Sequence, residues 1–213
     1  MRLIATPATL AVAMHHLKKH DARLATVIDS FGPPAITPHR NYYQSLVESI
    51  VSQQLSVKAS DTILKRFIAL FPGKTFPEPA DLLVADSEKM RAAGLSRQKA
   101  SYIQDLAVKI LDGSVRFEHL DDLDNDAVIT ELTAVKGIGV WTVHMFLIFC
   151  MGRLDVLPVG DLGIKNGMRS LYGLSEKPTV DELQVVAQKN NWHPYESVAS
   201  WYVWQSLDNQ PKL

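Results

Sequence analysis

One carboxylate, that of Asp161, stands where it could either cap a helix or take part in catalysis. Asp161 ends the segment Leu-Pro-Val-Gly-Asp (157–161) and directly precedes a stretch of helical period. An aspartate in that position commonly caps a helix, which stabilises it by about 1 kcal/mol. An ionised carboxylate can also stabilise positive charge that develops on a sugar, or orient and deprotonate a water molecule. The residue alone leaves capping and catalysis both open, and the two roles are compatible.

A glycine-rich turn precedes this aspartate in the chain. It reads Lys136-Gly137-Ile138-Gly139 and joins two segments of helical period. Glycine allows positive φ or a close approach of another molecule. The turn opens onto a helix N-terminus, where unpaired N–H groups and the helix dipole favour an anion such as a DNA phosphate. Such a contact positions a duplex without reading its sequence. The alternative is a tight helix–helix corner that binds nothing.

The elements that must position these residues are predicted to be helices only. Segments between proline or glycine breaks show helical period, and no hairpin signal separates two alternating strands. We expect an all-α protein in which the second helix breaks near Gln53–Ser56. The predicted helices are Ala8–Ser30, Tyr42–Leu70, Pro79–Ala92, Arg97–Asp112, Asn125–Ala134, Val140–Met151, Gly163–Tyr172, Thr179–Lys189 and Tyr195–Leu207.

Composition restricts the class of protein. The chain has 213 residues, 46% of them hydrophobic, which suffices for a globular core. A formal net charge of −1 argues against coating nucleic acid by bulk electrostatics, so any DNA binding must be local. The single cysteine, Cys150, can form neither an internal disulfide nor the set of about four thiolates that holds an iron–sulfur cluster. A reducing compartment fits this cysteine usage.

Hydropathy favours neither a membrane segment nor a signal peptide. The longest apolar run, Val140–Met151, is too short for a bilayer and reads as a buried helix. The N-terminal residues lack a sustained hydrophobic stretch before a cleavage site. We expect no membrane association and a cytoplasmic location at the bacterial nucleoid, or a nuclear one in a eukaryote.

The hairpin segment resembles a known family. Residues 132–142, Leu-Thr-Ala-Val-Lys-Gly-Ile-Gly-Val-Trp-Thr, are similar to the hairpin of the helix-hairpin-helix DNA glycosylases, above all the 3-methyladenine DNA glycosylase II branch. The likeness runs from about Tyr42 to Trp204. It implies a two-lobed helical fold with the active site between the lobes. The whole chain, 1–213, then forms a single glycosylase domain, with lobes at about 38–130 and at 1–37 plus 131–213.

The resemblance also implies an activity. It is hydrolysis of the N-glycosidic bond of alkylated purines, of the 3-methyladenine type, in duplex DNA at the start of base excision repair. The family carries its catalytic aspartate in a Pro-x-x-Asp segment after the hairpin, which corresponds to Asp161. A cationic alkylated base leaves readily, so no second carboxylate and no cofactor are needed for the chemistry. The protein is expected to act as a monomer.

The hairpin carries the DNA contacts that the resemblance implies. A sodium or potassium ion would be held by the backbone carbonyls of Thr133, Val135 and Ile138 and bridge to a phosphate. The amides that would contact phosphate oxygens are those of Gly137, Gly139 and Thr142. We also expect the basic side chains of Lys136 and Lys165 to contact DNA.

Trp141 decides between two reaction types. Relatives that also cut the strand place a lysine at this hairpin-helix position, and its amine attacks the sugar to form a Schiff base. Tryptophan has no such amine, so the expected product is an intact abasic site. Lys136 lies on the wrong side of the hairpin glycines to replace it.

Extrusion of a base from a duplex requires a side chain that fills the gap. The segment Ile50–Ser56 resembles the family's Ile-x-x-Gln-Gln-x-Ser sequence, which carries the intercalating residue. Gln54 is the first choice, with Gln53 and Leu55 as alternatives. Two solvated glutamines on a helix are the competing interpretation.

The pocket for a cationic base should be aromatic, because cation–π attraction contributes about 0.5–2 kcal/mol. Trp141 and Trp204 are the main candidates, the latter within a C-terminal pattern, Trp-x-Pro-x-x-Ser-x-Ala-x-x-x-x-Trp, that resembles the family's ending. Met145 stands where some relatives have an aromatic residue, and Tyr42 is a further candidate. Gly160 replaces an acid present in others, which leaves base preference open.

Two other classes remain open from the sequence. A non-catalytic helix-hairpin-helix module would share the hairpin but would need neither a buried acid nor an aromatic pocket. An all-α protein-interaction domain with an incidental Gly-Ile-Gly turn is favoured only by the near-neutral charge.

Overall fold

The structure is a computed structural model that describes residues 3–208. Of the described residues 63% are helical, and within the same range the β pairing is limited to an isolated bridge between Ile4 and Arg153. The all-α prediction is therefore confirmed. The chain divides into two compact units, which we describe separately: unit 1 comprises residues 1–40 and 147–213, and unit 2 comprises residues 41–146.

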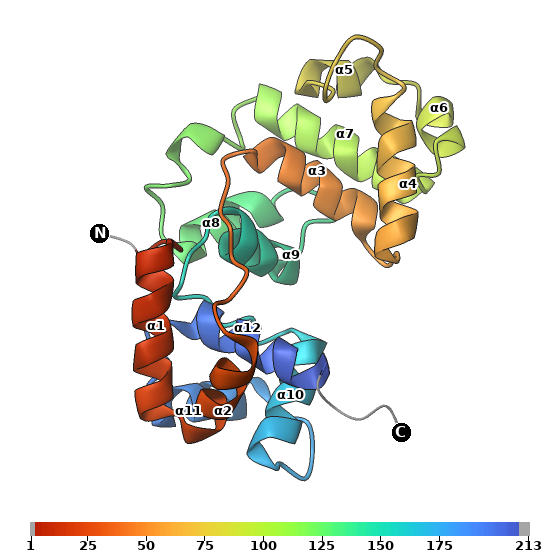
Figure 1. Cartoon of the computed structure of the whole chain (residues 1–213). Coiled ribbons are helices and arrows are strands. Elements are labelled where there is room, and N and C mark those ends of the chain that lie inside the picture. Colours follow the sequence, from red (N-terminus) through yellow and green to blue (C-terminus); the bar gives the residue numbers. More distant parts are fainter. Residues whose placement is uncertain (1–2, 209–213) are drawn as a thin grey trace. The chain divides into compact units, whose positions relative to one another are not determined.

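Unit 1 is built around a C-terminal helix. Helix α12 packs against α10, α2 and α1, as Figure 1 shows. The core of unit 1 contains the fully buried residues Leu17, Leu24, Met168, Trp192 and Tyr202. The helices of this unit are α1 (Pro7–His20), α2 (Ala22–Phe31), α10 (Leu162–Tyr172), α11 (Val180–Lys189) and α12 (Glu196–Asp208).

A buried carboxylate holds the far end of α10 in unit 1. Asp21 Oδ2 accepts hydrogen bonds from Trp192 Nε1 at 2.9 Å and from the hydroxyl of Tyr172. Asp21 is 1% exposed. Burial and the contact with Asp21 raise the pKa of Tyr172, so its hydroxyl stays a donor. The end of α10 is thereby fixed to the start of α2.

Unit 2 packs α7 against α5, α6 and α3, and α9 against α8. Its core contains Leu46, Phe67, Ile103, Val128 and Leu132, all fully buried. The elements are α3 (Tyr42–Ser52), α4 (Val57–Ile68), α5 (Pro79–Val84), α6 (Ser87–Ala92), α7 (Arg97–Leu111), a 3₁₀ turn (Phe117–His119), α8 (Asn125–Thr133) and α9 (Val140–Met145). After α9 the chain continues as a π-helical segment, Phe146–Cys150.

The helix boundaries differ from the sequence prediction at two aspartates. The helix predicted at Ala8–Ser30 is broken at Asp21, whose carboxylate accepts hydrogen bonds from the amides of Arg23 and Leu24 and so starts α2. The helix predicted at Pro79–Ala92 is broken likewise at Asp86, which caps α6. A carboxylate that satisfies amides of a new helix competes with continuation of the old one. The predicted break near Gln53–Ser56 is confirmed.

The hairpin falls in unit 2, whereas the lobes drawn from the sequence placed residues 131–146 with the C-terminal part. The physical reason is local packing, because α9 folds back against α8. In addition, Gln53 Nε2 donates a hydrogen bond to the carbonyl of Gly137 at 2.8 Å, which ties the turn to the end of α3.

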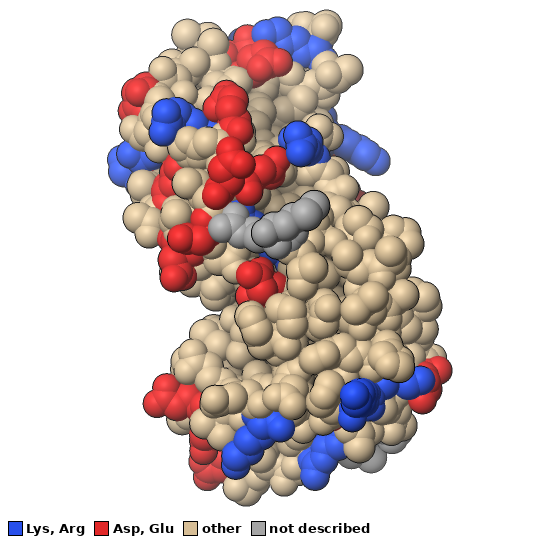
Figure 2. Space-filling model, turned by 90° about the vertical axis from the view of Figure 1, so that its left-hand side faces the viewer, with Lys and Arg blue, Asp and Glu red and all other residues tan. Residues whose placement is uncertain are grey.

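The distribution of surface charge and the length of the helices indicate which large partners the protein could contact. Figure 2 shows one face, on which Lys and Arg side chains form separate groups among acidic and uncharged residues. This face therefore carries no continuous basic surface. In residues 3–208, no helix has the length and apolar character needed to cross a bilayer.

Candidate functional site

Asp161 lies at the N-terminus of α10 with its carboxylate held from two sides. Its Oδ1 accepts hydrogen bonds from the amide of Ile164 at 2.7 Å and from Trp204 Nε1 at 2.9 Å. The residue is 9% exposed. The predicted cap is confirmed, since the Asp161 side chain accepts from the amide of Ile164 in the first turn of α10. A carboxylate with a fixed direction in a largely dry site is a suitable group for stabilising positive charge.

Two glycines allow α12 to reach Asp161. A Cβ on Gly163 would lie 2.9 Å from Asp161 Oδ1 and 3.0 Å from Trp204 Cδ1. A Cβ on Gly167, one turn further along α10, would lie 2.7 Å from the carbonyl oxygen of Val203. Residues four apart share a face of a helix. This face of α10 therefore has to be free of side chains for Trp204 to reach the carboxylate.

Sequence reasoning missed two residues at this position. Gly163 is predicted only as the start of a helix, and as the second residue of α10 it gives no sequence signal of its contact with Trp204. Phe149 was assigned to a buried helix, whereas it is 36% exposed and its ring centroid lies 5.9 Å from that of Trp204. No signal in the sequence indicates that Phe149 and Trp204 pack together.

Lys165 lies one turn after Asp161 on α10, and its amide donates to the carbonyl of Asp161 at 3.1 Å. Its side chain is partly exposed. Asp161, Trp204 and Lys165 are thus the predicted site residues in unit 1. The other predicted residues all belong to unit 2.

The two hairpin glycines have different roles. Gly137 has φ of +82°, and a Cβ there would lie 2.0 Å from Tyr102 Cδ2, so neither the backbone nor the packing accepts a side chain. Gly139 is the N-cap of α9 with φ of −96°, and no heavy atom lies within 4 Å of the position of its Cβ. Of the two uses that the sequence leaves open for these glycines, Gly137 takes the positive φ. At Gly139 the open space permits the close approach of another molecule, and the phosphate contact stays a prediction.

Lys136 is paired within unit 2. Its amide donates to Asp105 Oδ2 at 2.9 Å, and its Nζ lies 3.2 Å from Asp105 Oδ1. Burial would raise the pKa of Asp105, but the hydrogen bonds and positive charge of Lys136 outweigh this effect and hold the pKa below its usual value. The lysine side chain is nevertheless 73% exposed. Its ammonium can therefore still face an anion in solution.

The hairpin carbonyls have the donor chemistry of a monovalent cation site. Carbonyl oxygens suit hard cations. The amide of Ile138 donates to the carbonyl of Val135 at 3.1 Å, which closes a tight turn containing both predicted ligands and lying next to Thr133. Among the residues that the structure describes, no group of His, Cys, Asp and Glu side chains is arranged to hold a metal. The sodium or potassium ion at the carbonyls of Thr133, Val135 and Ile138 stays a prediction.

The predicted wedge residues lie in the loop between α3 and α4. Gln54 is exposed and has φ of 57°, while Leu55 is 39% exposed. The side chain of Gln53 is partly buried and donates to the hairpin, so it is held by the protein. This geometry favours Gln54 or Leu55 over Gln53 as the side chain that enters a duplex.

The predicted pocket residues of unit 2 differ in exposure. Trp141 is 49% exposed and Met145 is partly exposed. Thr142, which was predicted to contact a phosphate through its amide, is 6% exposed. Tyr42 is 7% exposed, its hydroxyl donates to Asp121, and its ring centroid lies 5.4 Å from that of Phe146. Tyr42 is therefore a core residue of unit 2 with little ring surface to offer a base. The pocket role predicted for it is not favoured.

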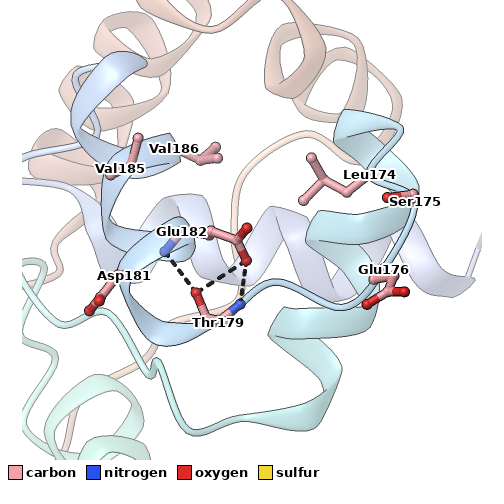
Figure 3. A pocket seen from close by; sticks show the side chains of 8 residues that line it. All are labelled: Leu174, Ser175, Glu176, Thr179, Asp181, Glu182, Val185 and Val186. Carbon is pink, nitrogen blue, oxygen red and sulfur yellow. Dashed lines mark hydrogen bonds between the residues drawn. The ribbon is translucent and has the colours of Figure 1, made fainter.

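A separate hollow in unit 1 has the wrong charge for DNA. Its volume is about 520 Å³ and its lining includes Glu176, Asp181 and Glu182. Figure 3 shows Glu182 hydrogen-bonded to Thr179 in the capping box that starts α11. Carboxylates at the rim repel phosphates. None of the predicted site residues lines this hollow.

Comparison with known proteins gives the same family from sequence and from structure. Residues 47–191 match the family described as HhH-GPD superfamily base excision DNA repair protein. The chain is 34% identical over 205 residues to DNA-3-methyladenine glycosylase 1 of Schizosaccharomyces pombe, covering 95% of this chain and 89% of that protein.

Solved structures that resemble this chain include 3-methyladenine DNA glycosylases. A 3-methyladenine DNA glycosylase from Schizosaccharomyces pombe in complex with abasic DNA superposes with a TM-score of 0.78 at 34% identity, covering 91% of this chain and 95% of that one. A DNA-3-methyladenine glycosidase from Bacillus halodurans gives a TM-score of 0.81 at 36% identity, covering 98% and 93%. With the hairpin, the capped Asp161 and these matches together, the chain belongs to the HhH-GPD superfamily of base excision DNA repair proteins.

Proposed function

We propose that the chain is a monofunctional DNA glycosylase that hydrolyses the N-glycosidic bond of alkylated purines in duplex DNA. The observation that carries this proposal is the carboxylate of Asp161, fixed by Trp204 Nε1 and by the amide of Ile164 at the start of α10. A module that only grips DNA has no need of a carboxylate held in this way. The names of the relatives at 34–36% identity support the substrate class.

The proposed reaction places little demand on acid catalysis. An alkylated purine such as 3-methyladenine is cationic, so it leaves as a neutral base once the bond from C1′ breaks. Asp161 stabilises the positive charge that develops on the sugar. Water adds to C1′ and loses a proton, and the products are a free base and an intact abasic site.

DNA would be held through the backbone rather than through base reading. The exposed amide end of α9 at Gly139, with the sodium or potassium ion proposed on the hairpin carbonyls, would contact one phosphate. Gln54 would fill the space of the extruded nucleotide, and Trp141 would offer an aromatic face to the charged base. One copy of the chain would act alone, in the nucleoid or the nucleus where its substrate lies.

The test is incubation of the purified protein with duplexes that each carry one defined lesion, followed by alkaline cleavage at any abasic site. Cleavage should appear after alkali at 3-methyladenine and more slowly at neutral hypoxanthine, because only the charged base gains cation–π stabilisation. Binding to every duplex with no alkali-sensitive product would favour the gripping module instead. Faster release of hypoxanthine would contradict the role of base charge.

A further inference from the structure

The loop Gln53–Ser56 in unit 2 holds a strained backbone at the residue proposed to enter the duplex. Gln54 has φ of 57°, in the left-handed region that residues with a side chain rarely adopt. Its side chain is exposed. A short exposed loop keeps such a conformation only when groups outside it hold it in place.

Lys99 of α7 supplies one of these groups. Its Nζ donates hydrogen bonds to the carbonyl of Val51 at 2.8 Å and to the carbonyl of Gln53 at 2.7 Å. Carbonyls at the C-terminal end of a helix lack partners within the helix and form the negative end of its dipole. The ammonium of Lys99 therefore satisfies the end of α3 and fixes the backbone immediately before Gln54. Burial around the ammonium lowers the pKa of Lys99, as expected for a cation partly withdrawn from water.

The side chain of Gln53 supplies the second group. Its Nε2 donates to the carbonyl of Gly137 at 2.8 Å. Gly137 lies in the hairpin turn, where Tyr102 occupies the space that a Cβ would need. Gln53 thus attaches the loop at two points: its backbone carbonyl binds Lys99 of α7, and its side-chain amide binds the hairpin. Gln53, which the sequence assigned to DNA contact, is used inside the protein.

We propose that Lys99 and Gln53 are positioning residues that clamp the loop, so that Gln54 stays in the duplex while the lesion nucleotide is extruded. This inference rests on the proposed function. Extrusion loses the stacking and pairing of the nucleotide, and its return to the stack opposes the inserted side chain. A loop that is ordered before binding loses less conformational entropy when Gln54 inserts. Loss of the clamp should therefore slow base release most where the lesion is well paired.

The experiment compares Lys99→Met with Lys109→Met, a matched change on the same helix α7. Single-turnover release of 7-methylguanine is measured from two duplexes, one with the lesion opposite a base and one with it opposite an abasic site. Lys99→Met should slow release about tenfold from the paired duplex and less than about twofold from the unpaired one. Affinity for undamaged DNA should stay within about twofold. Lys99→Arg should restore release, and Lys109→Met should match the wild type.

An equal loss on both duplexes would overturn the clamp, because Lys99 would then only support the fold. If Lys99→Met cannot be purified, Gln53→Met removes the hairpin side of the clamp and allows the same comparison. If the wild type releases no lesion base, the proposed function fails by itself. Amide hydrogen exchange at residues 53–56 then tests the clamp independently. Exchange should be faster in Lys99→Met than in Lys109→Met, and equal exchange would overturn the inference.

Discussion

The indole Nε1 of Trp204 donates a hydrogen bond to Asp161 Oδ1 at 2.9 Å, across 43 residues of sequence. The same oxygen caps α10 through the amide of Ile164. The tryptophan proposed as a pocket wall thus has a second use, since it fixes the direction of the carboxylate.

Asp161→Asn should abolish excision and leave affinity for lesion DNA within a few-fold. The amide keeps an oxygen that can accept from Ile164 and Trp204, but it loses the negative charge that stabilises the sugar cation. We expect single-turnover release to fall at least about 100-fold. Near wild-type turnover in this variant would mean that Asp161 is only a helix cap.

Trp204→Phe should lower the rate of excision about tenfold or more while preserving the ring contact with Phe149. A hydrogen bond to a charged group contributes about 1.5–3 kcal/mol, and loss of Nε1–H removes it from Asp161. Trp201→Phe changes a tryptophan of the same helix whose ring packs against that of Tyr202, and it is the control. If Trp204→Phe excises as fast as the control, Trp204 acts through its ring alone.

Gly163→Ala should lower excision about tenfold or more, because the new Cβ would lie 2.9 Å from Asp161 Oδ1 and force the carboxylate or Trp204 to move. Alanine favours a helix by up to about 1 kcal/mol relative to glycine, and this gain offsets the cost of displacing these groups. The temperature of thermal unfolding should therefore change little. Gly160→Ala is the matched control, since no heavy atom lies within 4 Å of the position of its Cβ. Unchanged turnover in Gly163→Ala would show that the site tolerates a displacement of these groups.

The hairpin glycines should separate binding from stability. Gly139→Ala fits a φ of −96° and open space, so stability should change by less than about 0.5 kcal/mol. Affinity should nevertheless fall several-fold, equally for damaged and undamaged duplexes, because a phosphate contact does not distinguish them. Gly137→Ala should instead lower the free energy of unfolding by more than about 2 kcal/mol, through strain and the clash with Tyr102. A loss at Gly139 confined to lesion DNA would place the hairpin at the base rather than at the backbone.

Borohydride should trap no covalent adduct between the protein and lesion DNA, and the strand should stay intact until alkali is added. The reason is Trp141, which supplies no amine where a strand-cutting relative has lysine. The products are separated by denaturing gel electrophoresis with and without borohydride. A trapped adduct that persists when every lysine but one is replaced would contradict the monofunctional assignment.

Local chemistry explains what could be predicted from the sequence. Helical period, the Lys-Gly-Ile-Gly turn, the break at Gln53–Ser56 and the cap at Asp161 each depend on residues within one or two helical turns. Their hydrogen bonds and backbone freedom can therefore be inferred from residue type and spacing. The breaks at Asp21 and Asp86 were missed, because a helical period continues through a capping residue that restarts the helix.

Tertiary packing decided the rest. The contact of Trp204 with Asp161 requires α12 to approach the glycine face of α10, and helical period says only which residues face inward, not which helix they meet. In the same way, folding pairs Lys136 with Asp105, buries Tyr42 in the core of unit 2 and brings Lys99 to the end of α3. Such long-range pairings arise from how whole helices pack, which no local pattern in the chain encodes.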